Sequence, residues 1–216
     1  EERRGIHAWT CGAVTAGLKA AAKIAETADP GNEAARYTRA AEGVLEGVRK
    51  HMWDTETGRF ARTARIDEQR HIQRDTTPDS SIAGLFLFGA MEPDDSGLSA
   101  TMDAVFQALS VHTPLGGIAR NRGDYYFRVT DDLDRVPGNP WVICTLWAAR
   151  WAALKGQAAQ ARRMVDTALR MASPTGMLPE QVNPITGEPF AVQPLAWAHA
   201  ELMLALLDAG LVRMDR

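Results

Sequence analysis

The sequence has few of the residues that build disulfide frameworks, metal centres or phosphate sites. Its two cysteines, Cys11 and Cys144, lie in apolar stretches expected to be helical, where a thiol is more often a small core residue than a bridge or a ligand. The five histidines are far apart and show no ligand spacing, and the sequence has no glycine-rich phosphate loop. We therefore expect reduced core cysteines, no metal site and no cofactor.

The sequence also lacks a charge imbalance and a long apolar run. There are 24 Lys and Arg against 27 Asp and Glu, giving a net charge of −3 with both signs interspersed, so we expect no nucleic-acid partner. The longest nearly apolar run, 82–91, is far shorter than the roughly 20 residues that cross a bilayer. We expect no membrane span, and no apolar signal segment opens the sequence as given. The expected reduced core cysteines indicate a cytoplasmic protein.

What the sequence does contain is a series of apolar periodic segments that predict seven helices. Asn139 and Pro140 are predicted to be the N-cap and first residue of the fifth helix, and Asp94-Asp95-Ser96 to open the fourth. A short hairpin is expected within 53–65, followed by a polar loop at 66–78, and a second, long loop is expected at 113–138. The predicted helices span 9–28, 32–52, 81–91, 97–111, 140–156, 158–172 and 194–209.

The predicted helices alternate between two kinds of surface. The second, fourth and sixth carry a single apolar stripe, whereas the others are apolar on most sides. This alternation predicts helical hairpins packed side by side, with one helix of each pair covered on both faces. No strong fixed-period repeat is visible, so the pattern favours a helical toroid over a solenoid. We expect an all-α single domain over 1–216.

Polar residues precede each predicted inner helix. Glu1-Glu2, Asp79, the segment 120–141 and Glu180 each lie just before one of them, so we expect all four to gather at one rim of the toroid. Carboxylates, arginine and tryptophan without a metal cluster suit the cleavage of glycosidic bonds, in which two carboxyl groups share the chemistry and an indole stacks on the sugar.

Three segments carry a resemblance to a known family. The first segment is Glu1-Glu2-Arg3-Arg4-Gly5. The second begins with Ile118-Ala119-Arg120, continues through Tyr126, and includes Gly138-Asn139-Pro140-Trp141 and Cys144-Thr145-Leu146. The third consists of Met177-Leu178-Pro179-Glu180-Gln181 followed by Pro194-Leu195-Ala196-Trp197-Ala198-His199-Ala200. With these segments the chain resembles the C-terminal part of the catalytic domain of glycoside hydrolase family 15, the glucoamylases, glucodextranases and family-15 trehalases.

The resemblance implies a partial (α/α)6 barrel and an inverting, exo-acting glycosidase of α-glucosides. Glu180 would be the general base that activates water, and Glu1 the general acid, with their carboxyl groups roughly 6.5–9.5 Å apart. Glu2, Arg120, Tyr126 and Trp141 would bind the carbohydrate substrate. Starch-type oligosaccharides, dextran and trehalose all stay open as substrates.

The chain also departs from the family pattern. The insertion Phe127–Pro137 lengthens the loop after Arg120 and leaves the shape of the sugar subsites open. Seven helices are fewer than the twelve of the barrel, so we expect a fragment whose open barrel edge allows self-association. If Glu1 is a true terminus, its α-ammonium group, with a pKa of about 7.7–8.0, favours the ionised carboxylate, and we expect little or no hydrolysis by this chain alone.

Several other residues are expected to have structural roles, not catalytic or binding ones. Asp79 is expected to cap a helix, Trp147, Trp151 and Trp197 to lie in the core, and the run 131–134 to be a solvated loop, with calcium binding as the alternative. The alternative function is a helical-hairpin module that binds a protein partner without catalysis. Site residues gathered on one rim would support the enzyme, whereas scattered ones beside a broad apolar groove would support the module.

Overall fold

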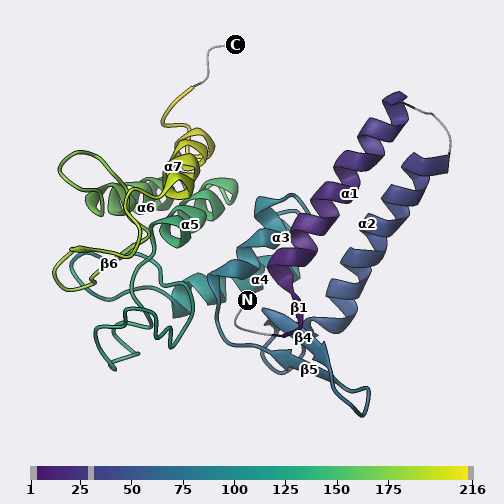
Figure 1. The fold of residues 1–216 in the computed structure, drawn as a ribbon, viewed down its shortest axis with the longest axis horizontal. Helices are drawn as coiled ribbons and strands as arrows, with labels where there is room; N and C mark the ends of the chain where they lie inside the picture. Colours follow the sequence, from purple (N-terminus) through teal and green to yellow (C-terminus); the bar gives the residue numbers. More distant parts are fainter. Residues whose placement is uncertain (1–3, 29–31, 214–216) are drawn as a thin grey trace. The chain divides into compact units, whose positions relative to one another are not determined.

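The computed structural model describes residues 4–28 and 32–213, which fall into two compact units (Figure 1). The first unit comprises the chain through Thr77 together with Ser81–Met102, and the second comprises Pro78–Ser80 and the chain from Asp103 onward. Seven α-helices lie in the described residues and confirm the expected all-α class. None of the helices within 4–28 and 32–213 has the length and apolar character needed to cross a membrane.

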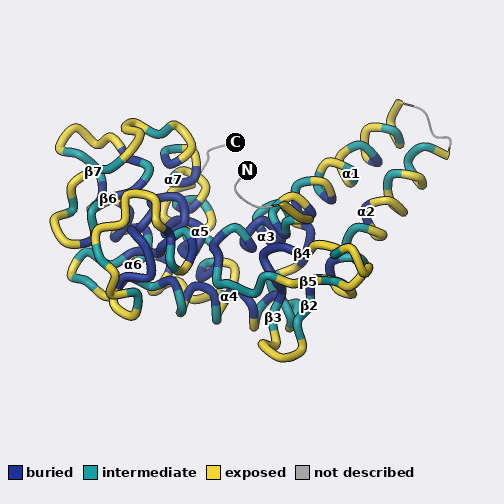
Figure 2. The backbone as a smooth tube through the Cα atoms, turned by 60° about the horizontal axis from the view of Figure 1, so that its bottom comes forward, coloured by how far each residue is buried: buried dark blue, intermediate teal, exposed yellow. Residues whose placement is uncertain are grey.

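A helical hairpin dominates the first unit. Helices α1 (Ala8–Ala28) and α2 (Asn32–His51) lie side by side, and α2 has the expected single apolar stripe, with Ala41 and Val48 buried. Helix α1 packs against both α2 and α3 (Gly84–Leu87), as expected for a helix buried on more than one side, but only over part of its length. Val14 and Ile24 are exposed, and the turns of α1 and α2 farthest from the strands face solvent (Figure 2). An apolar groove of about 330 Å³ runs between α1 and α2.

The third predicted helix, 81–91, is much shorter in the structure. A 3-10 turn, Ser80–Ala83, leads into α3 (Gly84–Leu87), and the helix then ends. Gly89 adopts a left-handed conformation with φ of 62°, and the N–H groups of Ala90 and Met91 both donate to the carbonyl of Leu85. This left-handed glycine closure stops the helix although the apolar residues continue.

Two glycines allow α1 and α3 to pack closely. A Cβ atom added at Gly84 would lie 2.9 Å from Cα of Trp9, and one added at Gly12 would overlap the carbonyl oxygen of Gly84. Backbone therefore meets backbone at this crossing, and a side chain on either glycine would force the helices apart.

Gly12→Ala should accordingly lower the free energy of unfolding by about 1–3 kcal/mol, the usual cost of overpacking. Gly17→Ala is the matched control on the same helix, because a Cβ there meets nothing within 4 Å. That change should stabilise the protein by about 0.5–1 kcal/mol through the better helix propensity of alanine. Urea denaturation measures the free energy of unfolding of both variants. Equal changes for Gly12→Ala and Gly17→Ala would contradict the close packing of α1 and α3.

Short strands complete the first unit. Strands β2 (Trp53–Asp54) and β3 (Arg59–Phe60) form the expected hairpin, whereas β1 (Ile6–His7), β4 (Thr63–Ile66) and β5 (Ile72–Asp75) form an antiparallel sheet in the order β1-β4-β5. Strand β5 lies within the region expected to be a loop, so that prediction is wrong. It contains one apolar residue, Ile72, and its pairing with β4 is made by backbone groups that leave no trace in side-chain periodicity.

Three helices form the body of the second unit: α5 (Val142–Leu154), α6 (Ala158–Arg170) and α7 (Ala196–Asp208). Helix α5 is buried on nearly every side, as its apolar sequence predicts, and α6 and α7 pack against it (Figure 2). Trp147 and Trp151 are in the core as expected, but Trp197 is 45% exposed on α7, and its assignment to the core is wrong. Met203 and Leu204 are also exposed on α7.

Helices α4 and α5 begin differently. In α4 (Ser96–Ala108), Oδ1 of Asp95 accepts the backbone N–H of Leu98 at 2.9 Å, which is the expected N-terminal cap. The cap predicted at Asn139 and Pro140 for α5 is wrong, because the N-cap is Trp141, in an extended conformation. Pro140 pairs instead with Ala119 in an isolated β-bridge, so the backbone before α5 is held by strand-like pairing.

Candidate active site

A chain of backbone bridges assembles the polar loops of the second unit. Three isolated antiparallel bridges pair Asp79 with Asn121, Ala119 with Pro140, and Trp141 with Gln181. Further backbone hydrogen bonds run from the N–H of Ser80 to the carbonyl of Arg120 and from the N–H of Val142 to the carbonyl of Glu180, at 2.8 and 3.1 Å. We call this connected set of bridges the loop ladder. It joins segments that lie up to about a hundred residues apart in the sequence.

The loop ladder brings together three of the four segments that were expected to share a rim. Asp79, Arg120, Trp141 and Glu180 are on the ladder or next to it. The fourth segment contains Glu1 and Glu2, which lie outside the described residues. Cys11 and Cys144 are buried and free, as expected.

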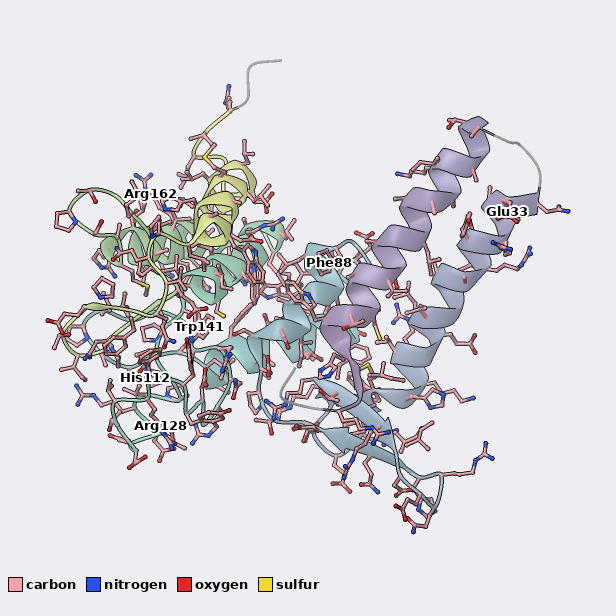
Figure 3. All side chains as sticks on the ribbon, viewed as in Figure 1. Glu33, Phe88, His112, Arg128, Trp141 and Arg162 are labelled. Carbon is pink, nitrogen blue, oxygen red and sulfur yellow. The ribbon has the colours of Figure 1, made fainter. Side chains whose placement is uncertain are left out.

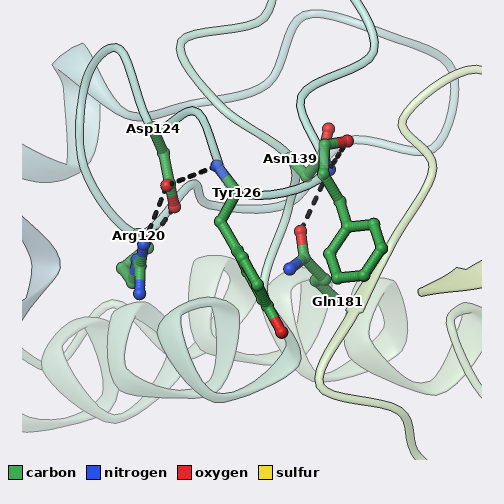
Figure 4. A network of polar contacts seen from close by, with 6 residues as sticks. Arg120, Asp124, Tyr126, Asn139 and Gln181 are labelled. Atoms are coloured by element: carbon green, nitrogen blue, oxygen red, sulfur yellow. Dashed lines mark hydrogen bonds and ion pairs between the residues drawn. The ribbon is translucent and has the colours of Figure 1, made fainter. Parts of the chain in front are cut away.

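Arg120 is held rigidly by Asp124. Its Nε and Nη2 atoms donate to the two carboxylate oxygens of Asp124, both at 2.8 Å, and Asp124 is only 3% exposed (Figure 4). Such a bidentate pair fixes the plane of the guanidinium as well as its position. The guanidinium carbon then lies 4.7 Å from the ring centroid of Trp141 and 5.8 Å from that of Tyr126.

Tyr126 is placed by the same carboxylate. Its backbone N–H donates to Oδ1 of Asp124 at 3.1 Å (Figure 4). Its ring centroid lies 6.2 Å from that of Trp141. Trp141 itself sits among the loops of this unit (Figure 3) and is 7% exposed. Three of the four residues predicted to bind sugar, Arg120, Tyr126 and Trp141, therefore form one cluster around a positive charge; the fourth, Glu2, lies outside the described residues.

Glu180 has a fixed backbone and an unsatisfied side chain. Its N–H donates to the carbonyl of Val192 at 2.9 Å, and its own carbonyl accepts from Val142. Its Oε2 atom is buried and accepts no hydrogen bond from any described residue. Burial raises the pKa of this carboxyl group, the positive charge of Arg120 acts against the rise, and the negative charge of Asp124 adds to it.

Other polar atoms on neighbouring residues are also left without partners. The Nε1 atom of Trp141, Nε2 of Gln181 and Oδ1 of Asn139 are buried and have no hydrogen-bond partner in the described part of the chain. Asn139 meanwhile donates through Nδ2 to Oε1 of Gln181 and to the carbonyl of Phe127, at 3.0 and 2.8 Å (Figure 4). Buried polar groups in folded proteins nearly always have partners, so this cluster of donors and acceptors indicates a site for a ligand rich in hydroxyl groups.

Three residues that build this site, Asp124, Asn139 and Gln181, were not predicted as site residues from the sequence. The sequence predicts Asn139 to be a helix cap, includes Gln181 only within a matching segment, and assigns no role to Asp124. Their burial, with all three at most 3% exposed, marks them as important because polar residues are rarely buried without a role, but the sequence alone carries no signal of it.

Two aspartates of the acidic loop 131–134 form ion pairs with arginines. Asp134 pairs with Arg122 at 2.8 Å and Asp131 with Arg128 at 3.6 Å, and both aspartates are more than nine-tenths exposed. Within 4–28 and 32–213 no group of three or more His, Cys, Asp or Glu residues could hold a metal ion.

Comparisons with known proteins identify the family of this chain. Residues 1–207 match the family model for glycosyl hydrolases family 15. An uncharacterized glycosyl hydrolase of Methanocaldococcus jannaschii is 28% identical over 222 residues, which cover 96% of this chain and 33% of the relative.

Solved structures show the same fold. A bacterial glucoamylase in complex with acarbose is 25% identical, with a TM-score of 0.76 over 95% of this chain and 33% of its own. A structure described as a wild-type glycosidase is 22% identical, with a TM-score of 0.78 over 99% of this chain and 54% of its own. The chain thus spans a third to about half of the length of these relatives, and its fold is part of a glucoamylase-like helical toroid. It belongs to glycosyl hydrolases family 15.

Proposed function

We propose that this chain forms part of an inverting, exo-acting glycosidase that hydrolyses α-glucosides. The observation that carries the proposal is the buried, unpartnered Oε2 atom of Glu180, on the same loop ladder as the cluster of Arg120, Tyr126 and Trp141. A general base needs a carboxylate that is free to accept a proton, and its raised pKa makes that carboxylate a stronger base than an ordinary glutamate.

In the proposed reaction Glu180 takes a proton from water, whose oxygen forms a bond to the anomeric carbon. The bond from that carbon to the glycosidic oxygen breaks on the opposite side of the ring, and Glu1 donates a proton to the leaving oxygen. Arg120 and Trp141 would hold the sugar ring, with Tyr126 beside them and Glu2 contacting the substrate. Glu1 and Glu2 lie outside the described residues, so their roles rest on the family resemblance alone.

The gathered site residues favour the enzyme over the protein-interaction module. The apolar groove between α1 and α2 and the exposed side chains of α7 share none of the residues of the site. We propose that these surfaces contact the further helices that a complete toroid requires, or a second copy of the chain.

The anomeric form of the first product tests this function. The full gene product that contains these residues would be incubated with α-linked gluco-oligosaccharides, and proton NMR would follow the released sugar before mutarotation. Inversion predicts that the β-anomer of glucose appears first. An α-anomer would refute the inverting mechanism, and no release from starch-type, dextran-type or trehalose substrates would refute the activity. The 216-residue chain alone, run in parallel, should release little or no glucose.

A further inference from the structure

A histidine side chain connects helix α7 to the loop that carries Glu180. The backbone N–H of Leu178 donates to Nε2 of His199 at 3.1 Å, a contact across 21 residues of sequence. Leu178 is only 1% exposed, and His199 is half-buried in the first turn of α7. No other described residue accepts a hydrogen bond from this N–H. His199 therefore satisfies a buried donor just before the proposed general base.

The same contact locates the proton of the His199 ring. A neutral imidazole has one N–H donor and one bare nitrogen that accepts, whereas both nitrogens of the protonated ring are donors. Because Nε2 accepts the N–H of Leu178, the proton of the neutral ring must be on Nδ1. The loop thus selects one tautomer of His199, and only the neutral ring can hold Leu178.

Glu180 lies between attachments to two helices. On its N-terminal side, Leu178 is bound by His199 of α7. On the other side, the carbonyl of Glu180 accepts from the N–H of Val142, the first residue of α5, at 3.1 Å. Helices α5 and α7 pack against each other. The short backbone segment around Glu180 is therefore anchored to a packed pair of helices at both ends.

The further hydrogen bonds of this segment are made by backbone groups or lie at the surface. Glu180 directly precedes β6 (Gln181–Val182), which pairs with β7 (Pro189–Phe190), and its N–H donates to the carbonyl of Val192 at 2.9 Å. The carbonyl of Leu178 accepts from the N–H of Leu195 at 2.9 Å, a bond that needs no particular side chain. The side chains of Ser173 and Gln193 bond to Met177, but both contacts are exposed.

The contact of Leu178 with His199 differs from these bonds because it is partly buried and depends on one side chain. A substitution at His199 can therefore remove this attachment of the loop while the backbone bonds remain. The effect on a general base would be large, because the base must lie within about 2.6–3.2 Å of the water that it activates. A displacement of about 1 Å can lower the rate about 100-fold.

We propose that His199 is a positioning residue for hydrolysis: by accepting the N–H of Leu178, it holds the backbone of Glu180 where the carboxylate can reach the attacking water. This inference rests on the proposed function and adds a residue that acts through the loop, without contact to the substrate. Because Arg120 and Trp141 are the residues proposed to hold the sugar, His199 should affect kcat and not KM.

The kinetic test uses two amides that differ in reach. In His199→Gln, Oε1 can take the place of Nε2 and accept from Leu178, whereas the shorter amide of His199→Asn cannot reach it. In the full gene product, His199→Asn should lower kcat on an α-linked oligosaccharide about 10–100-fold with KM nearly unchanged, and His199→Gln should recover most of this loss. His71→Asn is the control, since that side chain is 76% exposed between β4 and β5, and both constants should stay unchanged.

NMR tests the contact independently of activity. In the full gene product with ¹⁵N-labelled histidine, the signals of His199 are identified by their loss in His199→Gln. Correlations between the ring protons and nitrogens distinguish the two neutral tautomers, and His199 should show the proton on Nδ1. A proton on Nε2 of the neutral ring would overturn the proposal, because that nitrogen could then not accept from Leu178.

The kinetic results can also overturn the proposal. An unchanged kcat in His199→Asn, or an equal loss in His199→Asn and His199→Gln, would show that the hydrogen bond does not position the base. Thermal melting should give similar Tm values for the two variants, so that a difference in kcat reports the bond and not a loss of folding. If the unaltered gene product cleaves no α-glucoside, the proposed function fails and the positioning role fails with it. The NMR result separates the two failures: an Nδ1 proton in an inactive protein places the error in the function, and an Nε2 proton in an active enzyme places it in the contact.

Discussion

Glu180→Gln should lower kcat for glycoside hydrolysis by the full gene product by about 10²–10⁴-fold, the usual contribution of a general base. Glutamine has nearly the same shape as glutamate but cannot take a proton from water. Because the substrate would be held mainly by Arg120 and Trp141, KM should change far less than kcat. Steady-state kinetics on an α-linked oligosaccharide measures both constants, and a variant with more than a tenth of the original kcat would exclude Glu180 as the base.

The Tm of Glu180→Gln should depend on pH in a way that reports the raised pKa of Glu180 and shows that the variant is folded. The pKa of Glu180 is raised in the folded protein, so its contribution to stability is fully present below the unfolded pKa and is lost as the pH rises through the folded pKa. Glu180→Gln should therefore raise Tm at pH 7 and leave it nearly unchanged at pH 4. For the unaltered enzyme, the acidic limb of the rate profile should lie at higher pH than an ordinary glutamate gives. A lower Tm at pH 7 would contradict this assignment.

The second large effect concerns the contact between α5 and α7. Arg150 on α5 donates through Nε to Asp208 at 2.7 Å and through Nη1 to Glu201 at 3.1 Å, and both of these acids are on α7. The side chains of Arg150 and Glu201 are only 14% and 10% exposed. Arg150→Met would leave the carboxylate of Glu201 buried without its cation, which typically costs about 3–5 kcal/mol. Urea denaturation should show a loss of this size.

Two controls sharpen this prediction. Arg36→Met makes the same substitution in an exposed pair, Arg36 with Glu33, and should cost no more than about 1 kcal/mol. The double variant Arg150→Met with Glu201→Gln removes both charges and should recover part of the lost stability, because the penalty comes from the unpaired ion. If Arg150→Met and Arg36→Met lowered the free energy of unfolding by similar amounts, the ion pairs of Arg150 with Glu201 and Asp208 would not be effectively buried.

The sequence predicts the helices well because their signals are local. Apolar periodicity identifies the hairpin of α1 and α2 and the buried helix α5, and Asp95 marks the start of α4. The failures occur where distant contacts decide the structure. Pro140 looks like the first residue of a helix but pairs with Ala119, and Trp197 looks like a core residue although the described part of the chain leaves it half exposed.

For the site, the sequence predicts the residues proposed to contact substrate better than the buried residues that hold them in place. Arg120, Tyr126, Trp141 and Glu180 are identified through the family resemblance, and the structure places the first three in one cluster. The buried partners Asp124, Asn139 and Gln181 escape notice because a polar residue in a loop gives no sign that it is buried. Burial follows from the loop ladder, which exists only in three dimensions.

The loop ladder also fixes the ends of the loop between Asn121 and Pro140. Its bridges at Asn121 and Pro140 fasten both ends of the intervening segment, so that segment can grow or shrink while its attachment points stay fixed. Each doubling of a flexible loop costs only about 0.6 kcal/mol in closure entropy. The inserted part of this segment, 127–137, could therefore be exchanged for one of different length from a relative, provided that Asp124, Tyr126 and Asn139 are kept, because these three residues build the site. On the proposed function, such an exchange should change the substrate preference and leave the positions of Arg120 and Glu180 unchanged.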